Sequence, residues 1–399
     1  MAATLLSSFA LALPASAQIS DDVVKIGILN DQSGVFADLG GQGSVLAARL
    51  AIEEFGGTVL GKPIELIVGD HQNKPDIGSA IARRWIDTQN VDAIADVPSS
   101  ATAIAVQNVT RDKNRMLFLS SSGLSDFTGK RCSATTVHWT YDTYSNANGT
   151  ARALVKQGGD TWFFLTADNA GSHAQEQDAV GFVRKAGGKV LGAARHPLAT
   201  HDFSSFLVQA QSSNAKVIGL ANAGGDTITA VKQAKEFGIT QGGQKLAGLL
   251  MFITDIHAIG LADAQGLVFT DSFYWDMDDK TRAWSKTFMA RHGGRAPTSA
   301  QAGVYGAVLH YLKAIREAGT DEATAVSKTM KNLPVDDFWS NGFKIRQDGR
   351  LVRDMYLFEV KKPSESKGPW DYYKVLAKIP GDEAYRPIAE GGCPLVAQN

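Results

Sequence analysis

Short β-branched runs alternate with longer segments of helical period along most of this chain. Eight of these runs are apolar at nearly every position, four before residue 121 and four between residues 161 and 252. In order they are VVKIGIL, PIELIVG, VDAIADV and RMLFLS, then TWFFLTA, GKVLGAA, AKVIGLA and KLAGLLMF. Strands without a polar face belong in a parallel sheet that helices cover on both sides. The pattern therefore predicts an α/β fold made of two doubly wound units.

The remainder of the chain is predicted to complete both units. Helical segments at 278–292, 299–318 and 321–332 bring no new strands with them, so we expect them to pack on the first unit. The last apolar stretches, RLVRDMYLFEVKK and WDYYKVLAKI, predict a two-stranded ribbon around the polar turn at 363–369. The expected division is one lobe of residues 22–140 and 272–335, a second lobe of residues 141–271 and 348–385, and a tail of residues 386–399.

Three crossings between the lobes complete this arrangement. We expect them near Tyr141, near Asp271 and between residues 334 and 349. In open α/β sheets, ligands bind beyond the carboxyl ends of the strands, and a crevice between two lobes can bury a small molecule well. The sequence therefore predicts a binding site in the crevice between the lobes.

The first 17 residues, MAATLLSSFALALPASA, differ in character from the rest. An apolar centre at Leu11–Leu13 is followed by Ala15, Ser16 and Ala17, the small-x-small pattern of a signal-peptidase site. We expect residues 1–17 to be a signal peptide that exports the protein to the periplasm, although no Lys or Arg precedes the apolar centre. No later apolar run approaches the roughly 18 residues that span a bilayer, so we expect a soluble mature protein.

Composition adds two expectations. The chain has 40 Lys and Arg against 41 Asp and Glu, and these charges are interspersed, so the basic patch of a nucleic-acid-binding protein is missing. Its two cysteines, Cys132 and Cys393, are expected to form a disulfide in an oxidising compartment and to pin the tail to the body. Metal ligation is the alternative, but neither cysteine has a second cysteine or a histidine at ligand spacing.

Hydroxyl groups gather where two of the predicted strands end. Ser99 and Ser100 follow the run VDAIADV, and LFLSSSGLSDFTG contains Ser121, Ser122 and Gly123. Parallel strands bring these ends to one edge of the sheet, where hydroxyls and free backbone N–H groups at helix starts attract a carboxylate. Plain capping of the helices is the alternative use of the same serines.

The sequence gives little support to the hypothesis that the strand ends form an enzyme active site. A hydrolase nucleophile would stand in G-x-S-x-G, which the chain lacks. Gly40, Gly41 and Gly43 follow the first strand, but Leu46 replaces the third glycine of the dinucleotide motif and the preceding loop is too long for a phosphate turn. We expect no catalytic residue and no cofactor.

Histidines do not form a metal-binding motif either. His196 and His201 are the closest pair, in HPLATH, where the proline and the missing acidic residue favour a surface loop over a zinc site. Asp70 and His71 follow the run PIELIVG and are expected to be a polar strand end or a helix-capping feature. We expect no metal site.

The segments VVKIGILNDQSGVFADLGGQGSVLAARLAIEEFGG, LGKPIELIVGDHQNKPDIGSAIARRWID, DVPSSATAIAVQNV and VKQAKEFGI occur in this order. Together they resemble the type I periplasmic solute-binding proteins of ABC transporters, specifically the branched-chain-amino-acid-binding class, over about residues 22–360. The resemblance implies two lobes joined by a three-crossover hinge that closes on a ligand in the cleft, without covalent chemistry. It also implies delivery of the ligand to an inner-membrane permease and its ATPase, for which a monomer is suitable.

The resemblance also implies which residues form the site. In the family, donors after the third and fourth strands hold the ligand carboxylate, which corresponds here to the serines of both strand ends. Family aromatics are replaced at Gly171 and Ala223, and the position of the acid that pairs with the ligand ammonium falls near Leu250. The expected ligand contacts are Leu39, Ser99, Ser100, Ser121, Ser122, Gly123, Gly171, Asn222, Ala223, Phe252, Tyr274 and Trp275.

Without an ammonium partner, an amino acid would leave a buried charge unpaired. We therefore expect a small hydrophobic or aromatic carboxylate, of benzoate or phenylpropenoate type. The alternatives are a branched-chain or other amino acid, with Asp226 or Asp255 as the ammonium partner, and a sensor that presents its ligand-bound state to a membrane receptor.

Overall fold

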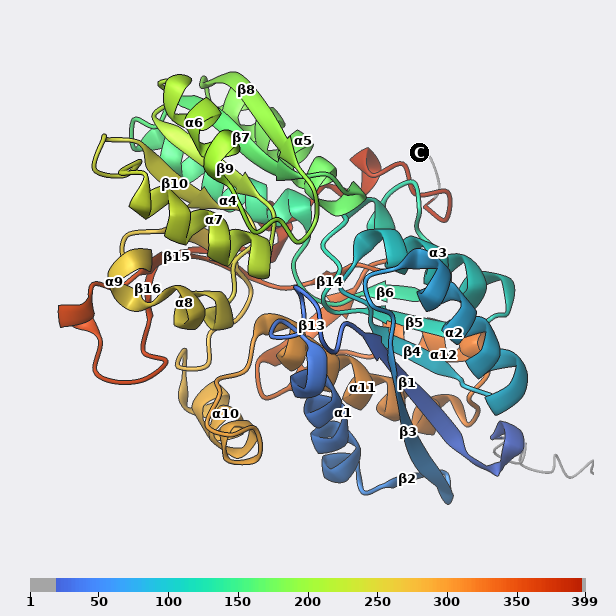
Figure 1. Ribbon diagram of the computed structural model, residues 1–399. Helices are drawn as coiled ribbons and strands as arrows, with labels where there is room; N and C mark the ends of the chain where they lie inside the picture. The colour runs from blue at the N-terminus through green and yellow to red at the C-terminus, as the bar shows by residue number, and fades with distance from the viewer. Residues whose placement is uncertain (1–18, 397–399) are drawn as a thin grey trace, which may run out of the picture.

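The computed structural model describes residues 19–396, whose strands form two large sheets in two lobes (Figure 1). The predicted signal peptide, residues 1–17, lies outside the described residues. In the described part, no helix is long and apolar enough to cross a membrane.

The first lobe is built on a six-stranded sheet that is parallel except for the short strand at one edge. Its strands, in spatial order, are β2 (Thr58–Val59), β3 (Lys62–Asp70), β1 (Val24–Asn30), β4 (Ala93–Asp96), β5 (Met116–Leu119) and β6 (Thr136–His138). Its helices are α1 (Gly41–Phe55), α2 (Pro75–Gln89), α3 (Ser100–Asp112), α10 (Asp279–Arg291), α11 (Ser299–Ala318) and α12 (Ala323–Asn332). As expected, the three late helices return to this lobe, where α11 packs beside α1.

The second lobe is built on a seven-stranded sheet. Its strands, in spatial order, are β16 (Tyr373–Ile379), β15 (Met355–Val360), β11 (Val268–Asp271), β10 (Lys245–Gly248), β9 (Val217–Ala221), β7 (Thr161–Ala167) and β8 (Lys189–His196). Its helices are α4 (Thr143–Lys156), α5 (Ala170–Lys185), α6 (Ser204–Ser212), α7 (Gly225–Glu236), α8 (Ile253–Ile259) and α9 (Leu261–Ala264). The predicted terminal ribbon is present as β15 and β16, and β15 also pairs with β11, so the ribbon extends this sheet.

The inner strands of each sheet are buried on both faces, which is why they carry no polar alternation. Ile26 and Ile28 of β1 belong to the core beneath α1 and α11, whereas Leu29 of the same strand belongs to the core beneath α2 and α3. In the second lobe, Phe163 and Phe164 of β7 likewise face opposite cores. The two doubly wound units predicted from the hydrophobic pattern are confirmed.

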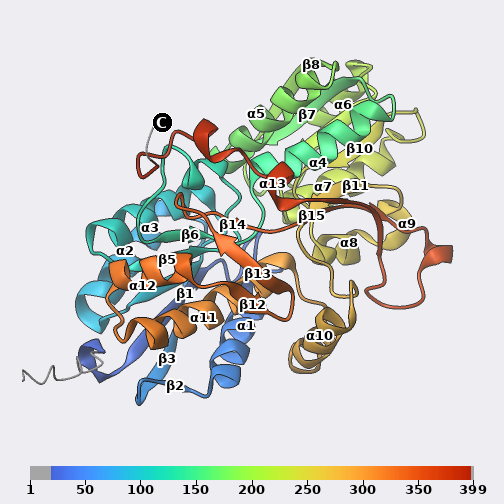
Figure 2. The ribbon, with the colours of Figure 1, turned by 180° about the vertical axis from the view of Figure 1, so that it is seen from behind.

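The third crossing lies slightly later than expected. A small antiparallel sheet of β12 (Val335–Asp337), β13 (Ser340–Ile345) and β14 (Leu351–Val352) packs on the first lobe. Next to it, the backbone of Arg350 forms a parallel β-bridge with His138, the last residue of β6. The chain therefore crosses at Arg353 and Asp354, just before β15 begins (Figure 2). The expected position, between residues 334 and 349, missed this sheet because its strands are short and only partly apolar.

The C-terminal segment returns to the first lobe after the short helix α13 (Gly381–Ala384). Cys393 forms a disulfide with Cys132, with Cα atoms 5.6 Å apart, as the sequence predicts. Arg386 lies where the segment passes both lobes: its guanidinium donates to the Ser125 hydroxyl at 2.9 Å and lies 3.4 Å from the Asp178 carboxylate on α5. The tail therefore contacts both sides of the hinge.

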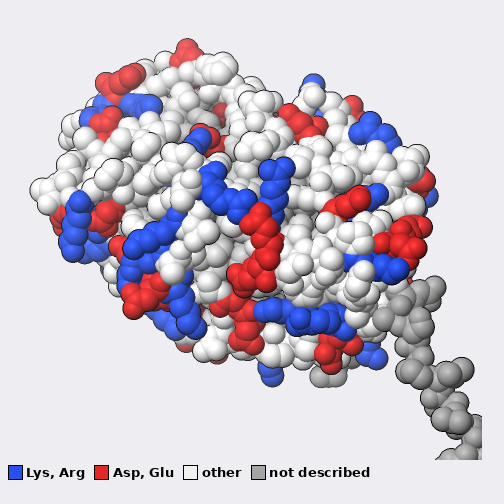
Figure 3. Space-filling model, turned by 90° about the horizontal axis from the view of Figure 1, so that it is seen from below, with Lys and Arg blue, Asp and Glu red and all other residues white. Residues whose placement is uncertain are grey.

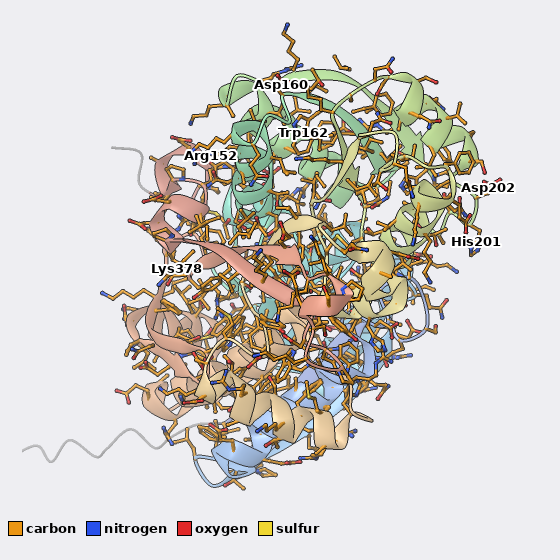
Figure 4. The ribbon with its side chains drawn as sticks, turned by 90° about the vertical axis from the view of Figure 1, so that its left-hand side faces the viewer. Arg152, Asp160, Trp162, His201, Asp202 and Lys378 are labelled. Carbon is orange, nitrogen blue, oxygen red and sulfur yellow. A yellow bond between two sulfur atoms is a disulfide. The ribbon has the colours of Figure 1, made fainter. Side chains whose placement is uncertain are left out.

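Positive and negative side chains are mixed on one face of the molecule rather than gathered by sign. Figure 3 shows Lys and Arg next to Asp and Glu over the visible face, without a broad patch of either. Figure 4 shows Arg152 and Lys378 at the edges of the second lobe, and Lys378 pairs with Asp354 at 2.7 Å. This face therefore resembles the balanced composition of the sequence.

Candidate functional site

A cavity of about 170 Å³ lies between the lobes, at the carboxyl ends of their strands. Both lobes contribute to its wall, and no other described cavity contains the predicted serines together. The lining residues are Phe36, Leu39, Asn73, Pro98, Ser99, Ser100, Ala101, Ser121, Gly123, Thr143, Ala167, Asp168, Asn169, Gly171, Ser172, Gln175, Leu198, Ala223 and Leu250.

Helix α3 begins at this cavity. Ser99 is its N-cap, and its hydroxyl accepts a hydrogen bond of 3.4 Å from the Thr102 N–H. The capping use of Ser99 is therefore realised. Ser100 and Ala101 are the next two residues of the helix and line the cavity, so the positive end of the helix dipole lies at the cavity wall.

Helix α5 begins at the same cavity from the second lobe. Asn169 is its N-cap, and its side-chain oxygen accepts from the Ser172 N–H at 3.0 Å. Ala223 lies just before a third helix start, that of α7, whose cap is Gly224 with φ 58°. Helix N-termini from both lobes thus converge on one small volume, an arrangement that favours an anionic ligand group.

Ser100 and Gly171 lie opposite one another across the cavity. A β-carbon built on Gly171 would lie 2.7 Å from the Ser100 hydroxyl oxygen, which is closer than such atoms pack. The Ser100 hydroxyl is in turn 3.1 Å from the hydroxyl of Ser122. Glycine at position 171 therefore allows the two helix starts to approach each other.

Ser121 lines the cavity and is hydrogen-bonded through its hydroxyl to Asp96 at the end of β4. Asp96 is completely buried, and burial raises the pKa of its carboxyl, while hydrogen bonds from Ser121 and Asn30 oppose that rise. Tyr141 fixes the same loop because its hydroxyl donates to the Ser121 carbonyl at 2.8 Å. A buried acid thus lies directly behind one of the predicted ligand donors.

The remaining wall of the cavity is mostly apolar. Phe36 and Leu39 come from the loop after β1, and Leu198, Ala223 and Leu250 come from loops of the second lobe. Leu250 lies near the position at which the resemblance implies an acid, and it contributes an apolar side chain to the wall. An apolar ligand body can therefore pack here while its charged end faces the helix starts.

Seven of the twelve predicted contacts line this cavity, and five do not. The seven are Leu39, Ser99, Ser100, Ser121, Gly123, Gly171 and Ala223. The Ser122 hydroxyl contacts that of Ser100 from behind the wall. Asn222 is buried next to Ala223, and its side chain contacts the His196 ring at 3.1 Å and accepts from the Thr227 hydroxyl at 2.7 Å. Both support the wall from behind.

The predicted aromatic contacts lie outside the cavity lining. Phe252 is fully buried against Tyr141, with ring centroids 5.5 Å apart, in the apolar cluster that also contains Leu39. Tyr274 and Trp275 are outside the lining and pack against the segment between β15 and β16, where the Trp275 indole donates to the Trp370 carbonyl at 2.8 Å. Both residues follow the end of β11 in an irregular segment, whose path the sequence pattern does not indicate.

The two acids proposed as ammonium partners are not in the lining. Asp226 accepts from the N–H groups of Ala199 and Thr200, and Asp255 accepts from the Phe252 N–H at 3.0 Å. Burial raises the pKa of Asp255 to about 7. The acid that does line the cavity is Asp168, whose carboxylate is 66% exposed and lies 2.9 Å from the His173 ring.

Histidines do not combine with the serines into a catalytic pair. Among the described residues no histidine ring bonds to a serine hydroxyl; the nearest case, His138, contacts the Ser122 carbonyl at 2.7 Å. His196 is buried beside Phe203, whereas His201 lies in an exposed loop at the margin of the second lobe (Figure 4). Within the described part, no cluster of His, Cys, Asp and Glu is arranged to hold a metal ion.

Several lining residues were missed from the sequence. Asn169 could have been found, because an Asn before a helical segment is a capping signal. Asn73 and Leu198 carried no such signal, since the paths of their loops bring them to the cavity, and Gln175 reaches it from α5, whose start lies at the cavity.

Comparison with known proteins agrees with this architecture. A model of the periplasmic binding protein family matches residues 23–368. A periplasmic binding protein from Burkholderia mallei, solved at 1.80 Å, is 50% identical and superimposes with a TM-score of 0.92, covering 94% of this chain and 99% of the other.

Two more distant relatives have names that mention a ligand. Leu/Ile/Val-binding protein homolog 6 from Brucella melitensis is 28% identical over 265 residues, which is 65% of this chain and 66% of the relative, just under two thirds of its length. A solute-binding protein of an ABC transporter from R. palustris, solved in complex with benzoate, has a TM-score of 0.82 over 94% of this chain and 100% of its own; at 18% identity the likeness concerns the fold. This chain belongs to the periplasmic binding proteins of ABC transporters.

Proposed function

We propose that this protein captures a small hydrophobic or aromatic carboxylate, of benzoate or phenylpropenoate type, and delivers it to an inner-membrane permease and its ATPase. One observation carries the proposal: the N-termini of α3 and α5, one from each lobe, meet at a cavity whose remaining wall is largely apolar. The helix starts suit the carboxylate, and Leu39, Leu198 and Leu250 suit an apolar body.

The dimensions of the cavity favour a small ligand. Its volume of about 170 Å³ is below the roughly 300–1,000 Å³ of sites for drug-sized molecules. Ser99 and Ser100 from the first lobe and Gly171 from the second would contact the same molecule. Binding is therefore proposed to hold the lobes together by hinge closure, with no bond made or broken.

The cellular location, the lobe limits and the oligomeric state are proposed from the family and from the sequence. Family membership places the protein in the periplasm, and we propose that residues 1–17 direct its export. We also propose the lobe limits given by the sequence, with the third crossing moved to Arg353 and Asp354. A monomer suffices for delivery, because both walls of the cavity come from one chain.

An amino acid is the second candidate ligand, and Asp168 favours it. Its carboxylate lines the cavity and could pair with an ammonium group. The first candidate is preferred because Asp168 is mostly exposed and already pairs with His173, so it offers a weak, screened partner.

Calorimetry separates the two candidates. The protein is unfolded and refolded to remove co-purified ligand, then titrated with benzoates, hydroxycinnamates, aliphatic acids, leucine and other amino acids. We expect micromolar or tighter binding of an aromatic acid and none of leucine. Micromolar leucine binding with silent aromatic acids would overturn the proposal, and mass spectrometry of the bound acid checks that it is released unchanged.

A further inference from the structure

Behind the carboxylate site proposed above, Asp96 forms a second layer. It ends β4, is completely buried, and is bonded through its two carboxyl oxygens to different partners. Oδ2 accepts from the Asn30 side-chain N–H at 2.8 Å, and Oδ1 is bonded to the Ser121 hydroxyl. Ser121 is itself part of the cavity wall, so this acid lies one residue behind the wall.

The backbone is distorted to place Asp96 there. Asp96 has φ 87° and Val97 has φ 51°, two consecutive residues in the left-handed region that side chains avoid, and Val97 is β-branched. Such strain persists where the surrounding structure holds it and is concentrated at functional sites. The distortion is therefore an independent sign that the position of this carboxyl matters.

The groups that face Asp96 supply no positive charge. They are Asn30 from β1, Ser44 from α1 and Ser121 after β5, all neutral, and the Tyr141 phenol lies beyond Ser121. Burial without a cation raises the pKa of the Asp96 carboxyl. A ligand carboxylate at Ser121 would raise it further, because two like charges would then share one hydroxyl.

The Ser121 hydroxyl has one hydrogen, and its direction determines which charge state of Asp96 can bind a ligand carboxylate. When Asp96 is ionised, that hydrogen points at Oδ1, and only oxygen lone pairs face the cavity. When Asp96 is neutral, Asn30 keeps Oδ2 as an acceptor, because the same amide nitrogen donates to the Gly41 carbonyl at 3.0 Å and to Oδ2. The acid proton then stays on Oδ1 and is donated to Ser121, whose own hydrogen turns to the ligand.

We propose that Asp96 is a positioning residue that is protonated in the ligand complex, where it releases the Ser121 hydroxyl to donate to the ligand carboxylate. Each binding event that starts from ionised Asp96 takes up one proton from solvent. The site would thereby favour a carboxylate over a neutral isostere such as an amide only when this proton is present. The inference rests on the proposed function and adds the residue that sets the charge state of its site.

Infrared difference spectroscopy tests it directly with benzoate as the probe. We expect the benzoate complex of the wild type to show the C=O band of a buried neutral carboxylic acid, and Asp96→Asn to lose that band while still binding benzoate. Asp92→Asn is the matched control: Asp92 is also buried, with a pKa raised to about 7, but precedes the other end of β4, away from the cavity.

The pH profile of benzoate affinity gives a second reading. Above the pKa of Asp96 in the free protein, wild-type and Asp92→Asn affinity should fall by up to about tenfold per pH unit, and Asp96→Asn should stay flat. Two results would overturn this inference but not the proposed function. One is an acid band that survives in the benzoate complex of Asp96→Asn, and the other is a fall of benzoate affinity with pH that is as steep in Asp96→Asn as in the wild type. Failure of benzoate and every other carboxylate to bind would overturn the proposed function and the inference with it.

Discussion

The backbone N–H of Gly225 donates a hydrogen bond of 3.1 Å to the carbonyl oxygen of Val35, joining the start of α7 to the loop after β1. The two residues belong to different lobes, and a β-carbon on neighbouring Gly224 would overlap the same carbonyl. A second link joins Ser125 to Asp178 on α5 at 3.1 Å. Direct contacts of this kind across the cleft describe a closed arrangement of the lobes.

If these contacts belong to the closed state, ligand should change the overall size of the protein. We expect small-angle scattering of ligand-stripped protein to show a larger radius of gyration than protein saturated with the tightest acid of the calorimetric panel, because opening the hinge separates Val35 from Gly225. Equal radii with and without saturating ligand would contradict hinge closure.

Substitution at Gly171 should weaken ligand binding without destabilising the fold. In Gly171→Ala, the added methyl group would lie 2.7 Å from the Ser100 hydroxyl and must push the two helix starts apart. We expect at least a tenfold loss of affinity, about 1.4 kcal/mol, measured by calorimetry.

Gly181→Ala is the matched control for this variant. Gly181 lies on the same helix, and a β-carbon there meets nothing within 4 Å. Its affinity should be unchanged and its thermal stability slightly higher, because Ala favours the helix by about 1 kcal/mol over Gly. Equal affinity in the two variants would show that the approach of Gly171 to Ser100 is unimportant for binding.

The disulfide should contribute measurably to stability. Cys132 and Cys393 are 261 residues apart in sequence, so the bond restricts a very long loop in the unfolded chain. We expect the Cys132→Ser/Cys393→Ser double variant to lose about 2–4 kcal/mol of unfolding free energy in urea titrations. Alkylation of two thiols in unreduced, exported protein would show instead that the bond does not form.

The sequence predicted the sheets well because their signal is local and repeated. Runs such as VVKIGIL are apolar on both faces, and the structure buries Ile28 and Leu29 in two different cores. The disulfide was equally accessible, since only one pairing of two cysteines exists. These predictions depend on periodicity and composition, which the chain displays without any knowledge of loop paths.

The site was only partly predictable, because its side chains are directed by loops. Ser100 and Ser121 follow strand ends and could be placed from topology, whereas Trp275 follows an equally clear strand and turns away to Trp370. Asp96 ends a run that reads as an ordinary strand, and neither its left-handed backbone nor its bond to Ser121 has a sequence signal. Long-range contacts of this kind require the folded chain.

Buried acids should make the protein less stable as pH rises from about 4 to about 7. Burial raises the pKa of both Asp255 and Asp271 from 3.8 to about 7, so in this range the folded state holds protons that the unfolded state has released. The stability that these two protonated acids contribute to the folded state is fully present below about pH 4 and is lost as pH rises through about 7. We expect denaturant titrations to show a flatter decline for Asp271→Asn; an unchanged slope would exclude Asp271 as a source.

The last prediction separates the two ligand classes at Asp168, the acid that lines the cavity. A carboxylate ligand gains nothing from this negative charge, so Asp168→Asn should leave its affinity unchanged or raise it slightly, since removing one exposed like charge is worth about 0–1 kcal/mol. An amino acid would instead lose its ammonium partner and bind more weakly. Asp202→Asn is the control, because Asp202 is an exposed acid in a loop of the same lobe that contributes nothing to the cavity wall. Calorimetry with benzoate and leucine on both variants gives the answer: a selective loss of leucine affinity in Asp168→Asn would reassign the site to amino acids and identify Asp168 as the residue that holds their ammonium group.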